Sequence, residues 1–428
     1  MLLRTAALAA LAIASCLPAP AQSRDAPGER LALDDAFARV ARAHPDLRLF
    51  GARTDALLAQ RDAAALRPPL RAGFDVENAL GTGDAGGFGG AEVTLTLAGV
   101  LERGGKLDAR RALAQSRIDA LAVQRETQRL DLLAETARRY LAVVAARAQR
   151  DIARTDIEQR QRAVAGARQR LQAGASPESV LLTAQAALAR AELAGERAAQ
   201  RESAARQHLA ALWSERNPAF EAATADLLDL PEVADTAALA SLLQGTPELA
   251  AFADERRIRE ARLQLARAST RADLDWQVGV RRLQADGDTA LVAGLSLPLG
   301  GAARARPEIR AAEAELAALE IERESRDVAL YSTLVEAHGR YRVARLEVER
   351  TRADVLPRLV RAEQAAERAW RAGAVSYLEW SQLQSETTAA RRQQLDAALE
   401  AQSALIELQR LTGQPFVVAD VAAEGNTP

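Results

Sequence analysis

Three glycines in the first hundred residues have the spacing of a nucleotide-binding motif. Gly81, Gly83 and Gly86 form a G-x-G-x-x-G, and the acidic Glu102 follows. In a dinucleotide site these glycines follow a strand and open a helix, because the pyrophosphate binds at the helix N-terminus. Here residues that alternate between apolar and polar stand on both sides of the glycines, which is typical of two strands. The sequence therefore predicts a flexible hairpin loop and no dinucleotide site.

Other residue types that could do chemistry are scattered. The segment GVLERGGKL at 99–107 lacks both the spacing and the Ser or Thr of a phosphate-binding loop. His44, His208 and His338 stand singly, far from any plausible nucleophile, and the single methionine is Met1. Proteins that hold soft or borderline metals usually cluster His, Cys or Met. The sequence predicts no enzyme, no cofactor and no metal site.

Composition indicates a helix-rich chain of two or three domains. The 428 residues are 48% hydrophobic but only 4% aromatic. The 56 basic and 58 acidic residues give a net charge of −2, and no stretch concentrates one sign of charge. This distribution disfavours a nucleic-acid partner.

Residues 1–21 predict a secretory signal peptide. Arg4 precedes an apolar run that ends in the small-residue pattern Ala19-Pro20-Ala21, and the run is too short to span a membrane. The only cysteine, Cys16, lies in IASC, which also fits a lipoprotein-type cleavage box. Cleavage after Ala21 and lipidation of Cys16 therefore both stay open, and neither leaves an internal disulfide.

The chain contains a tandem duplication. HPDL at 44–47 matches TPEL at 246–249, and AEVTLTLAG at 91–99 matches AGLSLPLGG at 293–301, both at an offset of 202 residues. We predict the following organisation: a first repeat at 22–213, a linker at 214–240, a second repeat at 241–413, and a tail at 414–428.

Each repeat is predicted to contain two amphipathic strands. Apolar and polar residues alternate at about 70–77 and 91–98 in the first repeat, and at about 273–281 and 289–299 in the second. The charged residues expected on the polar face are Arg71, Asp75, Glu77, Glu92, Asp273, Asp275 and Arg281. They are either the lining of a shared lumen or simply a solvated face.

A long helical hairpin is expected after each pair of strands, at 106–212 and at 308–412, with a kink at Pro357. A helix from residue 106 to 173 is roughly 100 Å long at 1.5 Å per residue. Helices of this length need partners along them. Four strands cannot close a membrane barrel, whose open edges lipid does not tolerate, so protomers must associate. The predicted fold class is mostly α with a small β part.

These features resemble a known family. The duplicated halves, the segments AGASPESVLLTAQ and AGAVSYLEW, and the start LALDDAFARVARAHPDL resemble the TolC-type outer-membrane efflux family. The stretch from FDVENALGTGDAGG to AEVTLTLAGVLERGGKLDAR is similar to its cobalt-zinc-cadmium heavy-metal branch. The resemblance implies a homotrimer with a 12-stranded barrel in the outer membrane of a Gram-negative bacterium and a helical tunnel in the periplasm. It also implies a periplasmic adaptor and an inner-membrane, proton-driven RND pump as partners, and export of heavy-metal cations.

The resemblance also implies that the hairpin tips dock to the adaptor, through Arg170, Gly174, Gly373 and Glu379. The family motif has an acidic residue six positions after the glycine. Glu379 fits this pattern, whereas Val180 stands at that place in the first repeat, and Ala369 stands where the first repeat has Arg170. A purely structural role of both glycines as helix-breaking turns is the alternative.

Two other functions stay open at this stage. A channel of the same kind could export drugs, or proteins by type I secretion. A periplasmic coiled-coil adaptor or scaffold would never enter lipid, but it would typically have one helical hairpin where this sequence has two.

Overall fold

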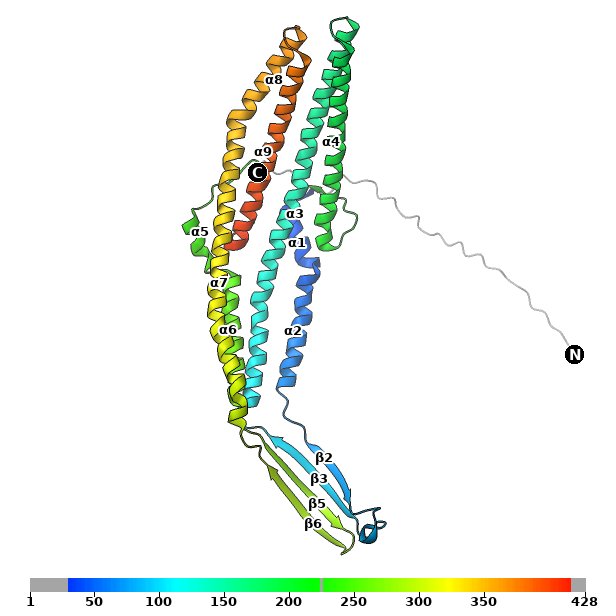
Figure 1. The fold of residues 1–428 in the computed structure, drawn as a ribbon, viewed down its shortest axis with the longest axis vertical. Coiled ribbons are helices and arrows are strands. Elements are labelled where there is room, and N and C mark those ends of the chain that lie inside the picture. Colours follow the sequence, from blue (N-terminus) through cyan, green and yellow to red (C-terminus); the bar gives the residue numbers. More distant parts are fainter. Residues whose placement is uncertain (1–29, 224–225, 417–428) are drawn as a thin grey trace, which may run out of the picture.

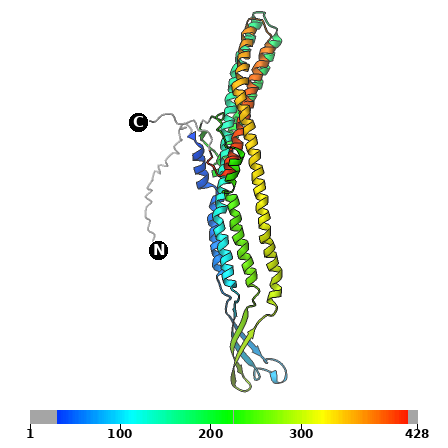
Figure 2. The same ribbon diagram turned by 90° about the vertical axis from the view of Figure 1, so that its left-hand side faces the viewer.

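The structure is a computed structural model that describes residues 30–223 and 226–416. The predicted signal peptide, Cys16 and residues 417–428 of the predicted tail lie outside the described residues. The described part is a long rod in both views, with a β-sheet at one end and two helical hairpin tips at the other (Figures 1 and 2). The predicted fold class, mostly α with a small β part, is confirmed.

The first half folds into two short helices, two strands and one long hairpin. Its elements are α1 (Leu33–Ala43), α2 (Pro45–Ala64), β2 (Arg71–Glu77), β3 (Glu92–Leu101), α3 (Lys106–Gln172) and α4 (Glu178–Ala210). The 67-residue α3 is continuous, because the segment is rich in alanine and has neither Gly nor Pro between Gly105 and Gly166. It packs along α2 at one end and along α4 at the other.

The second half repeats this order. Its elements are α5 (Thr236–Leu243), α6 (Pro247–Ala268), β5 (Leu274–Leu283), β6 (Asp288–Ser296), α7 (Gly301–Arg350), α8 (Leu356–Arg371) and α9 (Tyr377–Thr412). A single π-helical segment, Thr351–Val355, joins α7 to α8 immediately before Pro357. The wider π turn interrupts the regular hydrogen bonds just where proline has no N–H to donate, at the position of the predicted kink.

The start of the second hairpin differs from the prediction. We expected a helix from residue 308, after Pro307, but α7 begins at Gly301 and contains Pro307. Proline removes one hydrogen bond to the carbonyl four residues earlier. That carbonyl belongs to Ala303, which is exposed near the helix end, so water can replace the missing donor.

The four long strands form one antiparallel sheet with the order β2-β3-β5-β6. The glycine-rich segment is the loop between the paired strands β2 and β3, so the hairpin prediction is confirmed. Glycines make the bend from sheet to helix: Gly105 and Gly300, which precede α3 and α7, have φ of 75° and 80°. These left-handed values favour glycine over residues with a Cβ.

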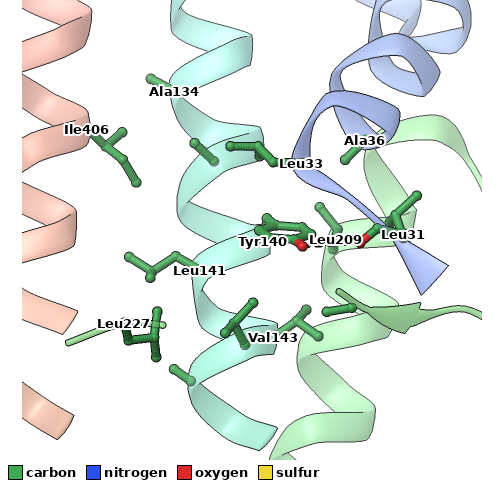
Figure 3. Close-up of a cluster of buried hydrophobic side chains, with 14 of the residues drawn as sticks. Leu31, Leu33, Ala36, Ala134, Tyr140, Leu141, Val143, Leu209, Leu227 and Ile406 are labelled. Atoms are coloured by element: carbon green, nitrogen blue, oxygen red, sulfur yellow. Dashed lines mark hydrogen bonds between the residues drawn. The ribbon is translucent and has the colours of Figure 1, made fainter. Parts of the chain in front are cut away.

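The largest hydrophobic core lies near the middle of the rod (Figure 3). There the short strands β1 (Arg30–Leu31) and β4 (Glu221–Ala222) pair in parallel beside α3 and α4. Tyr140 of α3 is fully buried, and its hydroxyl donates to the carbonyl of Leu31 at 3.1 Å. Its counterpart in the second half, Tyr341, donates in the same way to the carbonyl of Pro231, and burial raises the pKa of Tyr341 to about 12.

Candidate functional site: the sheet and the hairpin tips

The sheet has one apolar and one polar face, because its register aligns residues of like character. Asp75 pairs with Thr94, which pairs with Arg281 on the next strand. Residues paired in this way point to the same side. The polar face therefore carries the predicted charged residues of the strands: Arg71, Asp75, Glu77, Glu92, Asp275 and Arg281.

The opposite face is apolar and exposed. It presents Phe74, Val76, Leu95, Leu97, Val278, Val280, Leu291 and Leu295. The exposed fractions of Phe74, Leu291 and Leu295 are 67%, 89% and 75%. A soluble protein rarely leaves so continuous an apolar surface open.

Arg281 organises the charges at the loop end of the polar face. Its guanidinium lies 3.1 Å from a carboxylate oxygen of Glu77 and 2.9 Å from one of Glu92. Its Nε donates to the hydroxyl of Thr94 at 3.1 Å, and the Asn78 amide donates to Glu92. These contacts neutralise part of the acidic excess that the sequence predicted. Among the described residues, Asp75 and Asp275 form no ion pair.

Asp273 lies outside the strand in which we placed it. β5 begins at Leu274, and Asp273 sits at the junction of sheet and helices. Its Oδ1 accepts from the Lys106 ammonium at 2.8 Å and from the backbone N–H of Arg103 at 3.0 Å. It therefore fastens the start of α3 to the start of β5, and its charge is compensated there.

Both hairpin tips end in the same backbone turn. We call residues 170–181 the first tip and residues 369–380 the second tip. Gly174 and Gly373 have φ of 70° and 79°. In each tip the glycine N–H and the next N–H bond back to carbonyls of the last helical turn, for example Ala175 to Arg170 at 2.8 Å and Ala374 to Ala369 at 2.8 Å. This is the Schellman arrangement, which favours glycine at its left-handed position.

Arg170 bridges the two tips. It donates to the carbonyls of Trp370 and Arg371 at 2.8 and 3.2 Å, and its guanidinium lies 5.6 Å from the centre of the Trp370 ring. Arg170 thus adds charged donors to carbonyls in the last turn of α8, where the Trp370 carbonyl also accepts the Gly373 N–H. Of the predicted docking residues, the structure brings Arg170 and Gly373 together.

Glu379 is exposed near the start of α9. Its backbone N–H donates to the side chain of Ser376, the N-cap, at 3.2 Å. In the first tip Pro177 occupies the cap position of α4, and Val180 is partly buried against the apolar residues of the tip region. The tips therefore present one exposed acid per protomer at the motif position.

Sequence reasoning missed the aromatic cluster of the second tip. Trp370 and Trp380 stack with ring centres 4.7 Å apart, and Tyr377 meets Trp380 edge-on at 6.0 Å. The spacing of 377 and 380 on one helix face was a usable signal, because residues three apart on a helix are neighbours.

A buried polar cluster between α3 and α9 was also missed. Arg160 is 5% exposed, pairs with Asp156 at 3.1 Å, and donates to Gln384 and to the hydroxyls of Ser381 and Ser385. No local pattern marks the α9 residues as partners of Arg160, because they are more than 220 positions away from it.

Two kinds of feature are not found in the described part of the chain. None of its helices combines the length and the apolar character needed to cross a membrane. Over the same residues, no group of three or more His, Cys, Asp or Glu side chains is arranged to hold a metal ion.

Comparison with known proteins gives consistent matches. The family model described as "Outer membrane efflux protein" matches residues 38–215. The cobalt-zinc-cadmium resistance protein CzcC of Cupriavidus metallidurans is 25% identical over 314 residues, which cover 73% of this chain and 75% of CzcC.

Solved structures have the same fold over almost the whole chain. A structure of CusC superimposes with a TM-score of 0.74 and 17% identity, and covers 89% of this chain and 91% of that one. The CmeC outer membrane channel of Campylobacter jejuni gives a TM-score of 0.70 and 16% identity, with 89% and 85% covered. The match to the family model thus covers the first repeat, and the fold of almost the whole chain is that of these solved structures.

Proposed function

We propose that three copies of this chain form the outer-membrane duct of a tripartite efflux system, and that its cargo is heavy-metal cations. The open sheet is the observation that supports a duct built from several copies of the chain. Within the described chain β2 and β6 have one strand neighbour each, so both edges of the sheet present unpaired backbone groups. Lipid contains no water to satisfy such groups, so a sheet with an exposed apolar face must close with other copies.

Strand number and strand length agree with this assembly. Three copies of four strands make twelve, an even number within the range of outer-membrane barrels. β3, β5 and β6 have 10, 10 and 9 residues, close to the ~9–11 residues that a tilted strand needs to cross the hydrocarbon. In such a barrel the apolar face meets lipid, and the polar face lines the lumen.

The relation to CzcC, a cobalt-zinc-cadmium resistance protein, supports heavy-metal cations as cargo. Partners in this system would be a periplasmic adaptor and an inner-membrane RND pump, with the exposed Glu379 and the turns at Gly174 and Gly373 at the docking end. A duct need not bind what it conducts, so the proposal requires no metal site in its wall.

Growth of a deletion strain tests the cargo. Loss of the gene should lower tolerance to cobalt, zinc or cadmium salts, and the intact gene should restore it. A strain that loses tolerance only to antibiotics would indicate drug efflux, and one that fails only to secrete a protein would indicate type I secretion. Cross-linked trimers in the outer-membrane fraction test the assembly independently of the cargo.

The charges on the polar face of the sheet lead to a second prediction, which concerns the ion selectivity of the duct. Three strand carboxylates, Asp75, Asp275 and Asp288, form no ion pair in the described residues. Asp75 and Asp275 should therefore attract cations into the lumen, although salt screens charges beyond roughly 8 Å. In planar bilayers with a salt gradient, cation selectivity should shrink in Asp75→Asn and Asp275→Asn. Asp273→Asn should change it less, because Lys106 already compensates that charge. Equal effects of all three substitutions would contradict this assignment.

A further inference from the structure

Two adjacent arginines of β5 point to opposite faces of the sheet. Arg281 belongs to the polar face, where Glu77 and Glu92 compensate its charge. Arg282 belongs to the apolar face, because side chains alternate along a strand. It lies next to the last residue of β5, beside the turn to β6 and at the end of the sheet farthest from the helices (Figure 1). Of the described residues in the four long strands, Arg282 is the only charged one on the apolar face.

The exposed guanidinium of Arg282 is held by its own hairpin. Its Nη1 donates to the backbone carbonyl of Gly287 and, at 3.5 Å, to the hydroxyl of Thr289. Within the described chain Arg282 forms no ion pair, and its Nε and Nη2 have no acceptor. These two nitrogens lie along one edge of the planar guanidinium, and such an edge can donate to two oxygens of one anion at once. The side chain is therefore anchored through one nitrogen and keeps a free donor edge.

Apolar side chains cover the sheet between Arg282 and the helices. The register places Leu95, Val280 and Leu291 in one row across three strands, with exposed fractions of 59%, 44% and 89%. Trp276 lies on the same face, six residues or roughly 20 Å from Arg282 along β5. Aromatic rings near the rims are typical of lipid-facing sheets. A molecule that matched this surface would place an anionic head at Arg282 and apolar chains over the row below it.

We infer that Arg282 binds the phosphate headgroup of an anionic membrane lipid, whose acyl chains lie over the exposed apolar residues. The inference rests on the proposed function, because the barrel turns this face toward lipid. An arginine on a lipid-facing sheet is costly at the middle of the bilayer but tolerated near the headgroups, which its long side chain can reach. Phosphate suits the free edge, since guanidinium binds it in a bidentate manner. Because the turn after Arg282 is at the end opposite the periplasmic helices, the lipid belongs to the outer leaflet.

Nanodiscs that hold the full-length trimer test this inference through the headgroup alone. One preparation contains phosphatidylcholine, and the other contains an equal mixture of phosphatidylcholine and phosphatidic acid with the same acyl chains. A ligand of the folded state stabilises it, so the wild-type protein should melt at a higher temperature in the mixture. Arg282→Gln should lose most of this gain. Inorganic phosphate added to the phosphatidylcholine preparation should not reproduce it, because a free anion has no acyl chains to cover the apolar row.

Arg281→Gln is the matched control, since it removes the same charge one residue away on the other face. It breaks the ion pairs with Glu77 and Glu92, so it should lower the melting temperature equally in both preparations and leave the gain from phosphatidic acid unchanged. Arg282→Lys keeps the charge without the planar fork and should retain only part of the gain. This variant also serves as the test if Arg282→Gln does not fold.

Three results would overturn the inference: no gain of the wild-type protein from phosphatidic acid, a full gain in Arg282→Gln and Arg282→Lys, or an equal loss of the gain in Arg281→Gln. A wild-type gain produced by inorganic phosphate alone would identify a free anion in place of a lipid. Trimers that form in the outer membrane but ignore the headgroup would count against the lipid site only. Absence of trimers would contradict the proposed duct and, with it, this inference.

Discussion

At the first tip, α3 ends in a Schellman turn at Gly174, and Pro177 is the N-cap of α4. At the second tip, α8 ends in the same turn at Gly373, and Ser376 is the N-cap of α9. The side chains around these turns differ. Where the second hairpin has Trp370, Tyr377 and Trp380, the same distances from the glycine give Leu171, Glu178 and Leu181 in the first.

This difference separates what the duplication preserves from what it alters. The turn is preserved because it depends on one glycine and on backbone hydrogen bonds. The packing is not preserved, since the aromatic cluster of the second tip also supports Arg170 of the first tip. The second tip should therefore be the more stable of the two, and it should hold the first tip in place.

The largest loss in the free energy of unfolding is expected from Trp380→Ala. Trp380 is 2% exposed and stacks on Trp370, and truncation of a buried aromatic residue typically costs about 3–5 kcal/mol. Denaturant unfolding should show this loss. The matched variant in the first tip, Leu181→Ala, removes a partly buried side chain and should cost clearly less. Equal losses would refute the asymmetry between the tips.

Arg170→Ala should lower the free energy of unfolding by about 1–3 kcal/mol, because it removes charged hydrogen bonds to two carbonyls and a contact with Trp370. Arg170→Lys should rescue little of it, since an ammonium cannot reproduce the planar fork. The control is Arg168→Ala on the exposed side of the same helix turn. If Arg170→Ala instead abolished adaptor binding at unchanged stability, Arg170 would be a docking residue and not a bridge.

Substitution of the two glycines should give equal effects. Gly174→Ala and Gly373→Ala each force a residue with a Cβ into the left-handed region, at about 1–2 kcal/mol. A steric clash does not contribute to the cost at Gly174, because a Cβ added there would meet no atom within 4 Å. Gly51→Ala, inside α2 and equally open, should stabilise by about 0.5–1 kcal/mol. Unequal costs at the two tips would mean that the surroundings, and not the turn, select glycine.

The contrast between local turns and long-range packing also explains which features the sequence could predict. Strand alternation, the glycine turns and the kink at Pro357 are local signals, and each produced an element close to its expected place. The bridge from Arg170 to Trp370 spans 200 positions, and nothing near Arg170 in the sequence indicates it. Asp273 continues the alternation of polar and apolar residues that marks the strand. Its position beside Lys106, however, depends on how two segments distant in the sequence meet at the bend between sheet and helices. The start of α7 was missed because a solvent-exposed helix end tolerates Pro307.

The smallest effect concerns Glu363, which lies ten residues before Gly373 and is 9% exposed. The corresponding residue of the first hairpin is the buried Val164. Burial raises the pKa of Glu363 above its ordinary value, although a hydrogen bond from Thr387 and the charge of Arg391 oppose the shift. A carboxyl whose pKa is raised by folding favours the folded state when it is protonated, and this contribution is lost as pH rises through the folded-state pKa.

At a pH above the folded-state pKa of Glu363, the wild-type protein carries a buried charge that Glu363→Gln removes at almost constant shape. We expect the variant to melt at a slightly higher temperature in this range. The gap should narrow as the pH falls toward the ordinary glutamate pKa of about 4.5, because the wild-type carboxyl then becomes neutral as well. Melting curves across this pH range measure the effect. A variant that melts lower at pH 7 would indicate that Arg391 and Thr387 more than offset the cost of burial, and that the second hairpin gains stability from a charge where the first has only an apolar contact.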